Sequence, residues 1–381
     1  MVKLLPFFAA TVFFQPAFVL AVGGATGSPQ GFASGTTGGG DAAAVTPTTT
    51  AELIGYLGDS SPRVIIIDRE FDFTNTEGLC NDCAGCIPAS DTCGSEGQLS
   101  INANGWCGSD PATTVSYDKA AIEGIYVHSN KSIIGKGSNA IFRGKGLRLV
   151  NNVQNVIIQN IHFTDLNPEF IWGGDALTLD GTDNIWVDHC KFSLIGRQMI
   201  VLGFGPSGRV TISNCEFDGQ TSWSASCDGR HYWAILGYGN NDFVTFVGNY
   251  IHHTSGRSPR LDYNSLWHAV NNYWYSNSGH VFDVSSGSNA LIEGNVFENV
   301  TTTLLPDSTP GQVFVPRKST TGECAKYLNR NCYSNSVISS GSLSGSVTSF
   351  MVNFTGHDIA PAIPPSTVKA SVLAYAGVGK I

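Results

Sequence analysis

The middle of the chain repeats one pattern of apolar and polar positions. Each repeat has a short apolar run that ends in an aromatic or aliphatic residue, and these terminal residues recur 23 to 34 residues apart. The expected strands are Val156–Phe163, Ile185–Phe192, Val210–Phe217, Val244–Ile251, Trp267–Trp274 and Ala290–Phe297. A near-constant minimum length with occasional insertions is typical of a stacked solenoid.

The composition of the repeats indicates strands rather than helices. They are rich in Val, Ile, Phe, Asn and Gly and poor in the usual helix formers. Asn249, Asn272 and Asn295 each stand two residues before the end of a repeat. Because equivalent positions of a parallel β-helix stack about 4.7–4.9 Å apart, we expect these amides to form a ladder. Cys190 and Cys215 fall in the same column and are expected to be buried thiols.

The sequence also predicts how the stack begins and where a long loop leaves it. A solenoid exposes strand edges at its ends, and Thr50–Leu57 is predicted to be a short N-terminal capping helix with Thr49 or Thr50 near its N-cap. The long insertion between Phe217 and Ile251 is expected to project as a loop and to build one side of a cleft. The prediction is an all-β, single-domain parallel β-helix.

The N-terminal segment and the cysteines indicate an oxidising compartment. Residues 1–21 have an early lysine, an apolar run and a small-residue cleavage pattern, so we expect a signal peptide followed by one domain at 22–381. The ten cysteines then indicate disulfides rather than a metal site, with Cys324 and Cys332 expected to pair. Asn130, Asn299 and Asn353 begin glycosylation sequons. The protein is expected to be secreted.

Charge limits the class of partner. The chain carries 21 Lys and Arg against 30 Asp and Glu, a formal net charge of −9. Nucleic acid is not expected as a partner, because phosphate binding needs a basic surface. No segment beyond the N-terminal one is long and apolar enough to suggest a membrane protein. A neutralised, esterified polysaccharide fits this balance better than a strongly anionic one.

Six segments, taken in order, resemble the fungal pectin lyases of the pectate/pectin lyase superfamily (polysaccharide lyase family 1). They are Trp172–Ala176, Ile185–His189, Ile195–Gln198, Cys227–Ile235, His253–Arg260 and His268–Trp274. The resemblance runs from about Val22 to Lys380. It implies a right-handed parallel β-helix whose loops form a cleft. It also implies endo-acting cleavage of α-1,4 linkages in methyl-esterified galacturonan by β-elimination, by a monomeric enzyme.

The resemblance also assigns roles to individual residues. Arg257 is similar to the catalytic arginine that takes the C5 proton of the galacturonate. Arg197 is similar to the residue that contacts the substrate carboxyl group and stabilises the enolate-like intermediate, and Asp175 to the acid that orients Arg197. Arg260 stands where these lyases carry a lysine. A guanidinium has a pKa above about 12, so a basic Arg257 needs a site that depresses this pKa, with Arg197 and Arg260 as candidate causes.

Further residues follow from the same resemblance. Trp172, Tyr232 and Trp233 are similar to cleft aromatics that stack on esterified sugar rings. The cleft is expected to hold fewer aromatic side chains than the family's, because Ala89, Asp110 and Leu236 stand at positions where others carry them. Disulfides are implied between Cys93 and Cys227 and between Cys86 and Cys107, which leaves Cys80 and Cys83 unassigned.

The absence of clustered carboxylates separates two branches of the superfamily. Calcium-dependent pectate lyases hold Ca²⁺ with several acidic side chains, whereas Ile195–Phe204 contains neither Asp nor Glu. No metal and no cofactor are therefore expected. Three alternatives stay open at this point: a calcium-dependent pectate lyase, a hydrolase on the same β-helix, which would need two cleft carboxylates, and a non-catalytic β-helix that binds carbohydrate.

Overall fold

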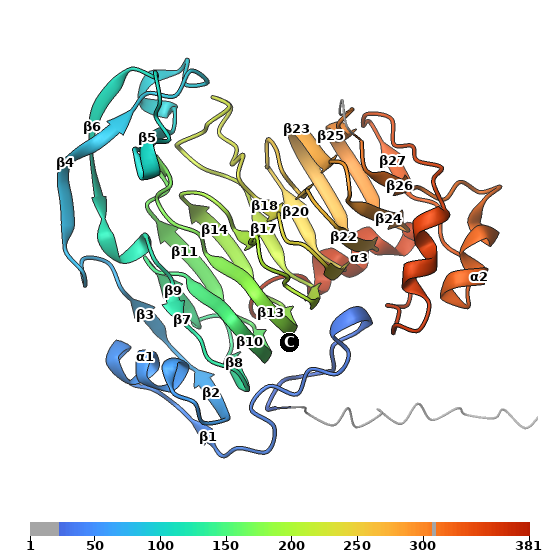
Figure 1. Cartoon of the computed structure of the whole chain (residues 1–381), viewed down its shortest axis with the longest axis horizontal. Coiled ribbons are helices and arrows are strands. Elements are labelled where there is room, and N and C mark those ends of the chain that lie inside the picture. The colour runs from blue at the N-terminus through green and yellow to red at the C-terminus, as the bar shows by residue number, and fades with distance from the viewer. Residues whose placement is uncertain (1–22, 307–309) are drawn as a thin grey trace, which may run out of the picture.

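A computed structural model describes residues 23–306 and 310–381, and the segment predicted as a signal peptide lies outside these ranges. The chain winds into a right-handed parallel β-helix, and successive coils stack along one axis (Figure 1). Each coil contributes strands to three faces, which are numbered here in the order in which the chain passes through them. The predicted fold class is confirmed.

The first face later carries the candidate site. Its strands are β7 (Ile125–Tyr126), the start of β10 (Leu147–Gln159), the start of β13 (Leu177–Asp188), β15 (Ile200–Leu202), β18 (Ile235–Gly237), β21 (Arg260–Leu261) and the end of β23 (Tyr273–Val284). All of these pairings are parallel, so equivalent residues form columns along the axis of the stack.

The second and third faces complete each coil. The second face contains β1 (Ala44–Val45), β2 (Arg63–Ile67), β8 (Lys131–Gly135), the ends of β10 and β13, β16 (Arg209–Ser213), β19 (Asp242–Val247), β22 (Ser265–Val270), β24 (Asn289–Glu293) and β26 (Gln312–Phe314). The third contains β3 (Glu70–Asp72), β9 (Ile141–Arg143), β11 (His162–Leu166), β14 (Lys191–Ile195), β17 (Glu216–Asp218), β20 (Tyr250–His252), the start of β23, β25 (Val296–Leu304) and β27 (Ser336–Ile338).

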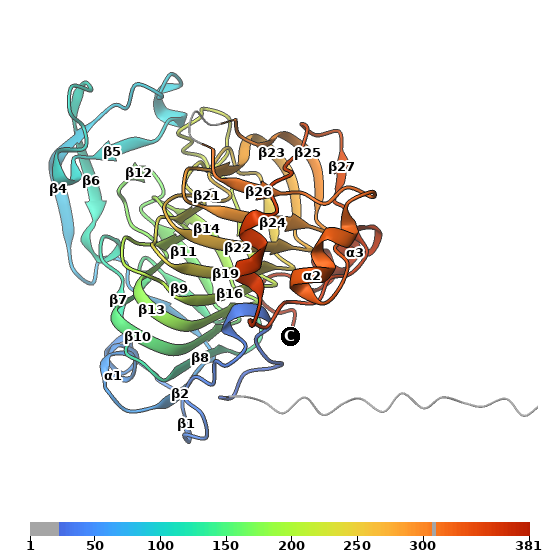
Figure 2. The same ribbon diagram turned by 45° about the vertical axis from the view of Figure 1, so that its right-hand side comes forward.

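A small second sheet projects beside the stack, where the labels β4, β5 and β6 stand in Figure 1. We call it the lateral sheet: β4 (Leu79–Cys86), β5 (Leu99–Ile101) and β6 (Ala112–Asp118), joined to the body through β12 (Phe170–Ile171). Its position beside the first-face strands is also visible after the 45° turn of Figure 2. The lateral sheet therefore forms a wall beside the first face of the β-helix, and the repeat pattern alone does not predict this wall.

The helices are short and lie at the ends or in the connections. They are α1 (Thr50–Gly58), α2 (Ala325–Leu328) and α3 (Pro365–Tyr375), with 3-10 turns at Gly31–Ala33, Gly94–Glu96, Ala103–Gly105, Lys119–Ala121, Thr321–Cys324 and Ser349–Phe354. The predicted capping helix is confirmed as α1. Thr49 is its N-cap, and a capping box with Glu52 satisfies backbone donors at its start. Among the described residues, no helix is long and apolar enough to cross a membrane.

The predicted strands are confirmed in position, but each predicted run contains parts of two strands and not one continuous strand. Each expected run is the end of a second-face strand, a tight turn and the start of a third-face strand, as with β10, Asn160 and β11. The third residue before the end of each run has a positive φ. These residues are Asn160, His189, Asn214, Gly248, Asn271 and Gly294. Asparagine and glycine tolerate this left-handed conformation, which explains why they punctuate the repeats.

Stacked side chains fill the interior. The rings of Phe163 and Phe192 lie 5.4 Å apart and nearly parallel, and Phe192 and Phe217 continue the stack at 5.2 Å. Cys190 and Cys215 are free and buried beside it, as predicted. Because stacked parallel strands place equivalent residues directly above one another, one aromatic position per coil builds a continuous apolar core.

The predicted asparagine ladder is present and one step longer than expected. The Asn249 side-chain Nδ2 donates to Asn272 Oδ1 at 2.9 Å, and Asn272 Nδ2 donates to Asn295 Oδ1 at 3.0 Å. Asn295 Nδ2 then donates to Asn335 Oδ1 at 3.0 Å. The side chains of all three predicted members are fully buried, so the ladder satisfies amides that would otherwise be costly.

Replacing Asn272 with leucine is expected to lower the free energy of unfolding by about 2–4 kcal/mol, because Asn249 loses the acceptor for its backbone N–H and its side-chain amide. Asn264→Leu is a matched control, since Asn264 Nδ2 makes the same kind of bond to Asn241 Oδ1 at an exposed site. Denaturant unfolding of both variants measures the difference. Equal destabilisation of the two would contradict a special role for the buried ladder.

A second stability prediction concerns a buried acid. Asp242 is 1% exposed and accepts a hydrogen bond from the Ser207 backbone N–H at 2.6 Å; burial raises the pKa of its carboxyl to about 7. Between the unfolded pKa near 4 and about 7, the folded protein therefore holds one proton more than the unfolded chain. Its contribution to stability is complete below the unfolded pKa and is lost as the pH rises through about 7.

Asp242→Asn is therefore expected to flatten the fall of the melting temperature between about pH 5 and pH 8, because the amide does not ionise. Glu169→Gln, at an exposed carboxyl, serves as the control. Thermal unfolding across this range tests the expectation, and parallel curves for wild type and Asp242→Asn would refute it.

The disulfides agree with the expected pairings and complete them. Cys86 bonds to Cys107, Cys93 to Cys227 and Cys324 to Cys332. The two unassigned residues, Cys80 and Cys83, bond to each other within β4. The bond between Cys93 and Cys227 joins the lateral sheet to the long insertion that follows β17, so two separate walls of the candidate site are covalently tied.

Candidate active site

The outward-facing residues of the first face form one column, which we call the floor column. Strand pairing places its members directly above one another, in the order Tyr126, Arg148, Thr178, Val201, Leu236, Arg260 and Asp283. Their neighbours along each strand, such as Ile200 and Ile235, point into the core and are fully buried. The alternation of strand side chains therefore presents this column to solvent.

A groove of about 610 Å³ lies over the middle of the floor column. It is lined by Asn104, Trp106, Ile171, Trp172, Arg197, Gln198, Val201, Gly203, Phe204, Trp233, Leu236, Tyr238 and Arg257. Four consecutive coils and the lateral sheet contribute to this lining, so the groove runs along the stack. It has an apolar floor, several aromatic rings and two arginines, which suits a sugar polymer of low charge.

Arg197 is held firmly at one wall of the groove. Its Nε lies 3.1 Å from Asp175 Oδ1 and its Nη2 lies 3.3 Å from Asp175 Oδ2, a two-point contact from the preceding coil. The guanidinium carbon also lies 3.8 Å from the ring centroid of Trp172. A charge fixed between a carboxylate and an aromatic face loses little freedom when it meets a substrate carboxyl group.

The backbone at Arg197 is anchored as well. Asp175 Oδ1 accepts the backbone N–H of Gln198 at 2.9 Å. His231 is buried, and burial lowers its pKa to about 4, so the ring is neutral near pH 7. Its Nε2 lies 2.8 Å from the carbonyl oxygen of Arg197 and therefore donates to it. The insertion after β17 thus positions the segment that leads into β15.

Arg257 is held differently, without a carboxylate. Its guanidinium carbon lies 4.7 Å from the centroid of Trp233 and 5.6 Å from that of Tyr232. Within the described residues it forms no ion pair, and its buried Nε has no hydrogen-bond partner. Burial is the main cause that lowers the pKa of Arg257, and the positive charge of Arg260 adds to it. Of the two expected causes, Arg260 contributes.

Both Arg257 and Trp172 have a positive φ, at 45° and 66°. This region is uncommon for residues with large side chains and costs on the order of 1–3 kcal/mol at each position. Neighbouring contacts hold the Arg257 backbone: its N–H donates to His280 Nε2 at 3.3 Å, and its carbonyl accepts the N–H of Ile235. Strained backbone of this kind is typical of sites whose geometry matters for function.

Arg260 lies in the floor column but does not line the groove. Its Nε donates to Asp262 Oδ2 at 2.7 Å and its Nη1 to Asp283 Oδ2 at 2.9 Å. These carboxylates raise its pKa, with the hydrogen bond to Asp262 as the main cause. The two carboxylates therefore compensate most of the charge of Arg260. Its remaining effect in the site is to lower the pKa of Arg257.

The three predicted aromatics occupy two kinds of position. Trp172 and Trp233 line the groove, and Trp233 Nε1 donates to Gln98 Oε1 at 3.0 Å. Tyr232 lies behind Trp233 with ring centroids 4.9 Å apart, and its ring packs where a side chain at Gly256 would stand. Glycine at 256 is thus required for the close approach of this ring to the Arg257 segment.

Several groove residues were not singled out from the sequence. Trp106 comes from the lateral sheet, and Phe204 and Tyr238 follow β15 and β18. Phe204 and Tyr238 lie edge to face at 4.8 Å. Leu236 lines the groove in place of an expected aromatic residue, while these three rings supply aromatic surface elsewhere. Phe204 and Tyr238 share one signal, an aromatic residue just after a first-face strand, which is visible only once the strand ends are known.

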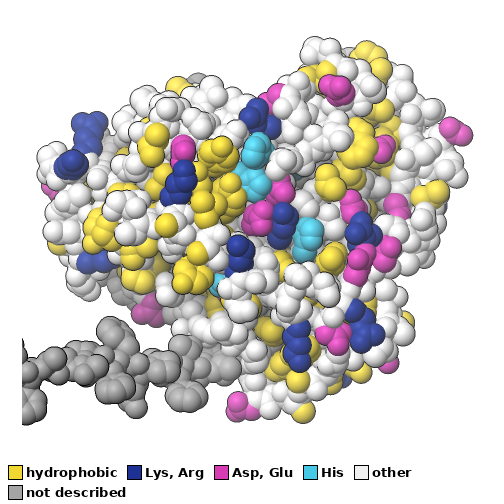
Figure 3. All heavy atoms as spheres, turned by 180° about the vertical axis from the view of Figure 1, so that it is seen from behind, with side chains coloured by type: hydrophobic (Ala, Val, Ile, Leu, Met, Phe, Trp, Pro, Cys, Tyr) yellow, Lys and Arg dark blue, Asp and Glu magenta, His cyan; other side chains and the backbone are white. Residues whose placement is uncertain are grey.

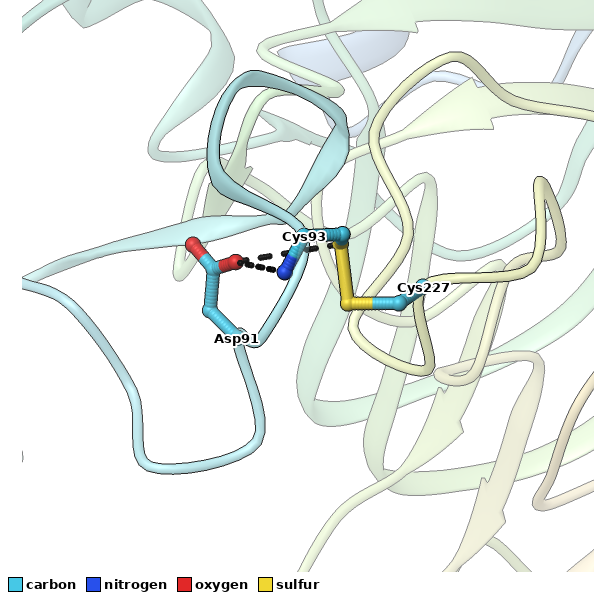
Figure 4. Close-up of side chains that lie close together, drawn as sticks. All are labelled: Asp91, Cys93 and Cys227. Carbon is cyan, nitrogen blue, oxygen red and sulfur yellow. Dashed lines mark hydrogen bonds between the residues drawn. A yellow bond between two sulfur atoms is a disulfide. The ribbon is translucent and has the colours of Figure 1, made fainter.

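Two groups of potential metal ligands occur among the described residues, and neither lines the groove. The first is Asp91 with Cys93 and Cys227, whose sulfur atoms form a disulfide (Figure 4). The second is Glu216, Asp218 and His252 on the third face. Its carboxylates already bind a cation.

Lys191 is that cation. Its Nζ lies 2.9 Å from Glu216 Oε1 and 3.1 Å from Asp218 Oδ2. His252 Nε2 also contacts Glu216. Mixed acidic, basic and histidine side chains gather over the centre of the surface seen from behind, without a continuous basic patch (Figure 3). The pair Asp188–His189 is structural as expected, because buried Asp188 accepts from His189 Nδ1 at 2.5 Å.

The sequence profile of the pectate lyase family matches residues 94–196 and 202–381, so the chain belongs to this family. It is 59% identical over 368 residues to "Probable pectin lyase F" of Aspergillus niger, covering 96% of this chain and 77% of that protein. It is 51% identical over 365 residues to pectin lyase B of Emericella nidulans, covering 94% and 95% of the two chains.

Solved structures agree on the fold. A pectate lyase from Bacillus sp. N165 in complex with trigalacturonate aligns with a TM-score of 0.59 at 20% identity, over 92% of this chain and 99% of that one. A Bacillus subtilis pectate lyase variant aligns with a TM-score of 0.59 at 18% identity, over 93% and 98%. Both are parallel β-helices like the chain described here.

Proposed function

We propose that the chain is a pectin lyase that cleaves α-1,4 linkages of methyl-esterified galacturonan by β-elimination in the groove of the first face. The observation that carries this proposal is the contrast between the groove arginines. Arg197 is paired with Asp175, whereas Arg257 has no carboxylate partner among the described residues and has a lowered pKa. Identity of 51–59% to fungal pectin lyases over most of the chain supports the same substrate and reaction.

In this mechanism Arg257 takes the proton from C5 of the sugar. The electrons of the C5–H bond first develop as an enolate on the carboxyl group, and Arg197 faces that negative charge with Asp175 and Trp172 fixing its position. The electrons then form the C4–C5 double bond while the C4–O bond breaks. The departing oxygen takes up a proton, and the products are a shortened chain and an unsaturated sugar end.

A methyl-esterified substrate fits the small number of charged side chains in the groove. A methyl ester makes the C5 proton more acidic than a carboxylate does and removes the need for a second cation beside the groove. Apolar Val201 and Leu236 at the floor, with Trp172 and Trp233 at the wall, favour a neutral sugar unit at the reacting position. We also propose that residues 22–381 form one secreted, monomeric catalytic domain that acts within the polymer and needs no metal or cofactor.

An assay that compares highly esterified pectin with polygalacturonate, each with and without a chelator, tests this function. We expect unsaturated product, detected by its near-ultraviolet absorbance, mainly from esterified pectin and without sensitivity to the chelator. Activity abolished by the chelator and restored by Ca²⁺ would indicate the calcium-dependent branch. Cleavage without new absorbance would indicate hydrolysis, and binding without cleavage would indicate a non-catalytic carbohydrate-binding protein.

A further inference from the structure

The floor column carries charge unevenly along the axis of the stack. At its C-terminal end, Arg260 meets two carboxylates, Asp262 and Asp283, so the local balance is negative. The middle of the column is neutral, with Thr178, Val201 and Leu236. A substrate carboxylate is therefore disfavoured at the C-terminal end, and in the middle the column itself supplies no cation, since Arg197 and Arg257 line the groove from outside the column.

The N-terminal end of the column carries an unpaired cation. Arg148 follows buried Leu147 in β10 and points outward, two coils before Val201. It is half-buried, and within the described residues it forms no ion pair. Its Nε is buried and has no hydrogen-bond partner. A guanidinium that is partly removed from water and left unpaired is costly unless a ligand satisfies it.

An aromatic ring lies beside this cation. Tyr126 is the next member of the floor column, and its ring centroid lies 5.9 Å from the guanidinium carbon of Arg148. The ring is 46% exposed and borders a hollow of about 300 Å³ that Glu77, Glu123 and Lys145 also line and whose lining does not include Arg148. Its hydroxyl donates to Glu123 Oε1 at 2.5 Å, which fixes the ring and occupies that carboxylate. A planar cation and an open ring thus stand side by side at the N-terminal end of the floor column.

Other arginines show that this arrangement is unusual in the molecule. Arg63, Arg143, Arg209 and Arg330 each contact a carboxylate within ion-pairing distance. In the described part of the chain, Arg148 shares the unpaired state with Arg257 inside the groove and with exposed Arg317. The guanidinium fork matches a carboxylate in two-point hydrogen bonding, and an aromatic face suits a sugar ring.

We propose that Arg148 and Tyr126 form a distal subsite that binds a galacturonate unit with a free carboxylate. This inference rests on the proposed function, since it concerns the same polymer on the same floor column. Two coils separate Arg148 from Val201, roughly 10 Å at the spacing of parallel strands, so the unit bound here is not the unit that reacts. The preferred substrate is then an esterified chain with one unesterified unit. That unit lies over the coil of Arg148, which precedes the coils of the reacting centre in the protein.

The test compares fully esterified polygalacturonate with a partly de-esterified sample of the same chain length. Wild type is expected to show a lower KM on the partly de-esterified substrate. Arg148→Gln is expected to raise that KM on the order of tenfold, the effect of losing one charge-assisted hydrogen bond, while kcat and the KM on the fully esterified substrate stay unchanged. Added salt should raise the KM of wild type on the partly de-esterified substrate and leave that of Arg148→Gln nearly constant.

Three further variants separate the effect of the Arg148 charge from misfolding, from a general loss of positive charge and from ring stacking. Arg148→Lys keeps the charge but loses the two-point fork, so it should retain part of the preference, and it also guards against misfolding of Arg148→Gln. Arg317→Gln removes an exposed arginine outside the floor column and should change nothing. Tyr126→Leu should raise the KM on both substrates, because ring stacking does not depend on the free carboxylate.

Loss of activity on both substrates alike in a folded Arg148→Gln, or no change on either, would overturn the distal subsite. Neither result would affect the proposed function, because wild type would still release unsaturated product. If wild type releases none from either substrate, the proposed function itself fails.

Discussion

Replacing Arg257 with alanine is expected to lower kcat on esterified pectin by about 10²–10⁴-fold, the range for removing a positioned general base. The fold should persist, because Arg257 forms no ion pair among the described residues and its loss gives up mainly the contact with Trp233. That contact is worth roughly 1–2 kcal/mol at a site largely removed from water. The measurement is release of unsaturated product, with thermal unfolding to confirm that the variant is folded.

Arg257→Lys separates charge from geometry. Lysine keeps a cation in the groove but cannot spread over the two rings of Tyr232 and Trp233 as a guanidinium does. We expect it to recover only a small part of the lost turnover. The control is Arg317→Ala, which removes an unpaired arginine from an exposed site. A folded Arg257→Ala protein with undiminished turnover would show that another group takes the proton.

Replacing Arg197 with glutamine is expected to lower kcat by about 10²–10³-fold, as for the loss of a fixed group that faces charge developing in the transition state. The expected rise in KM is smaller, because a neutral ester in the ground state offers little charge to bind. Steady-state kinetics on esterified pectin separates the two parameters. A rise in KM with unchanged kcat would mean that Arg197 binds substrate without stabilising the intermediate.

The chain offers a matched control for this pair. Arg209 contacts Asp183 on the second face in the same two-point manner that Arg197 contacts Asp175 in the groove. Arg209→Gln therefore removes an equivalent arginine–aspartate pair at a distance from the site. It is expected to leave kcat unchanged, so any shared loss of stability can be subtracted from the effect of Arg197→Gln.

The lateral sheet shows why part of the site escaped prediction. Trp106 lies in a segment with no repeat period, and it reaches the groove only because Cys93–Cys227 and the pairing of β5 with β12 hold that sheet beside the coils. Phe204 and Tyr238 were missed for another reason. They follow very short strands, and three-residue strands such as β15 and β18 have no alternation long enough to read from a sequence.

The outcome for Arg260 depended on register. In the sequence analysis Arg260 was a cation near the proposed base, and its contact with Asp262 was not predicted, although residues two apart in a strand lie on the same face. Strand pairing places Arg260 directly beside Asp283 of the next coil, which lies 23 residues away in the chain. The same register leaves Arg148 between Tyr126 and Thr178, so neither neighbouring position of the column holds a carboxylate.

The sequence by itself determined the parallel β-helix, the asparagine ladder with its neighbouring thiols and the capping helix, while the proposed roles of Arg197 and Arg257 came from the family resemblance. These features repeat along the chain or belong to short, ordered segments, so neighbouring residues carry their whole signal. Only the tertiary structure decided which arginines are neutralised and which aromatic rings line the groove. Ion pairing and cleft walls depend on contacts between separate coils and the lateral sheet, and those contacts are set by strand register and insertion length rather than by local pattern.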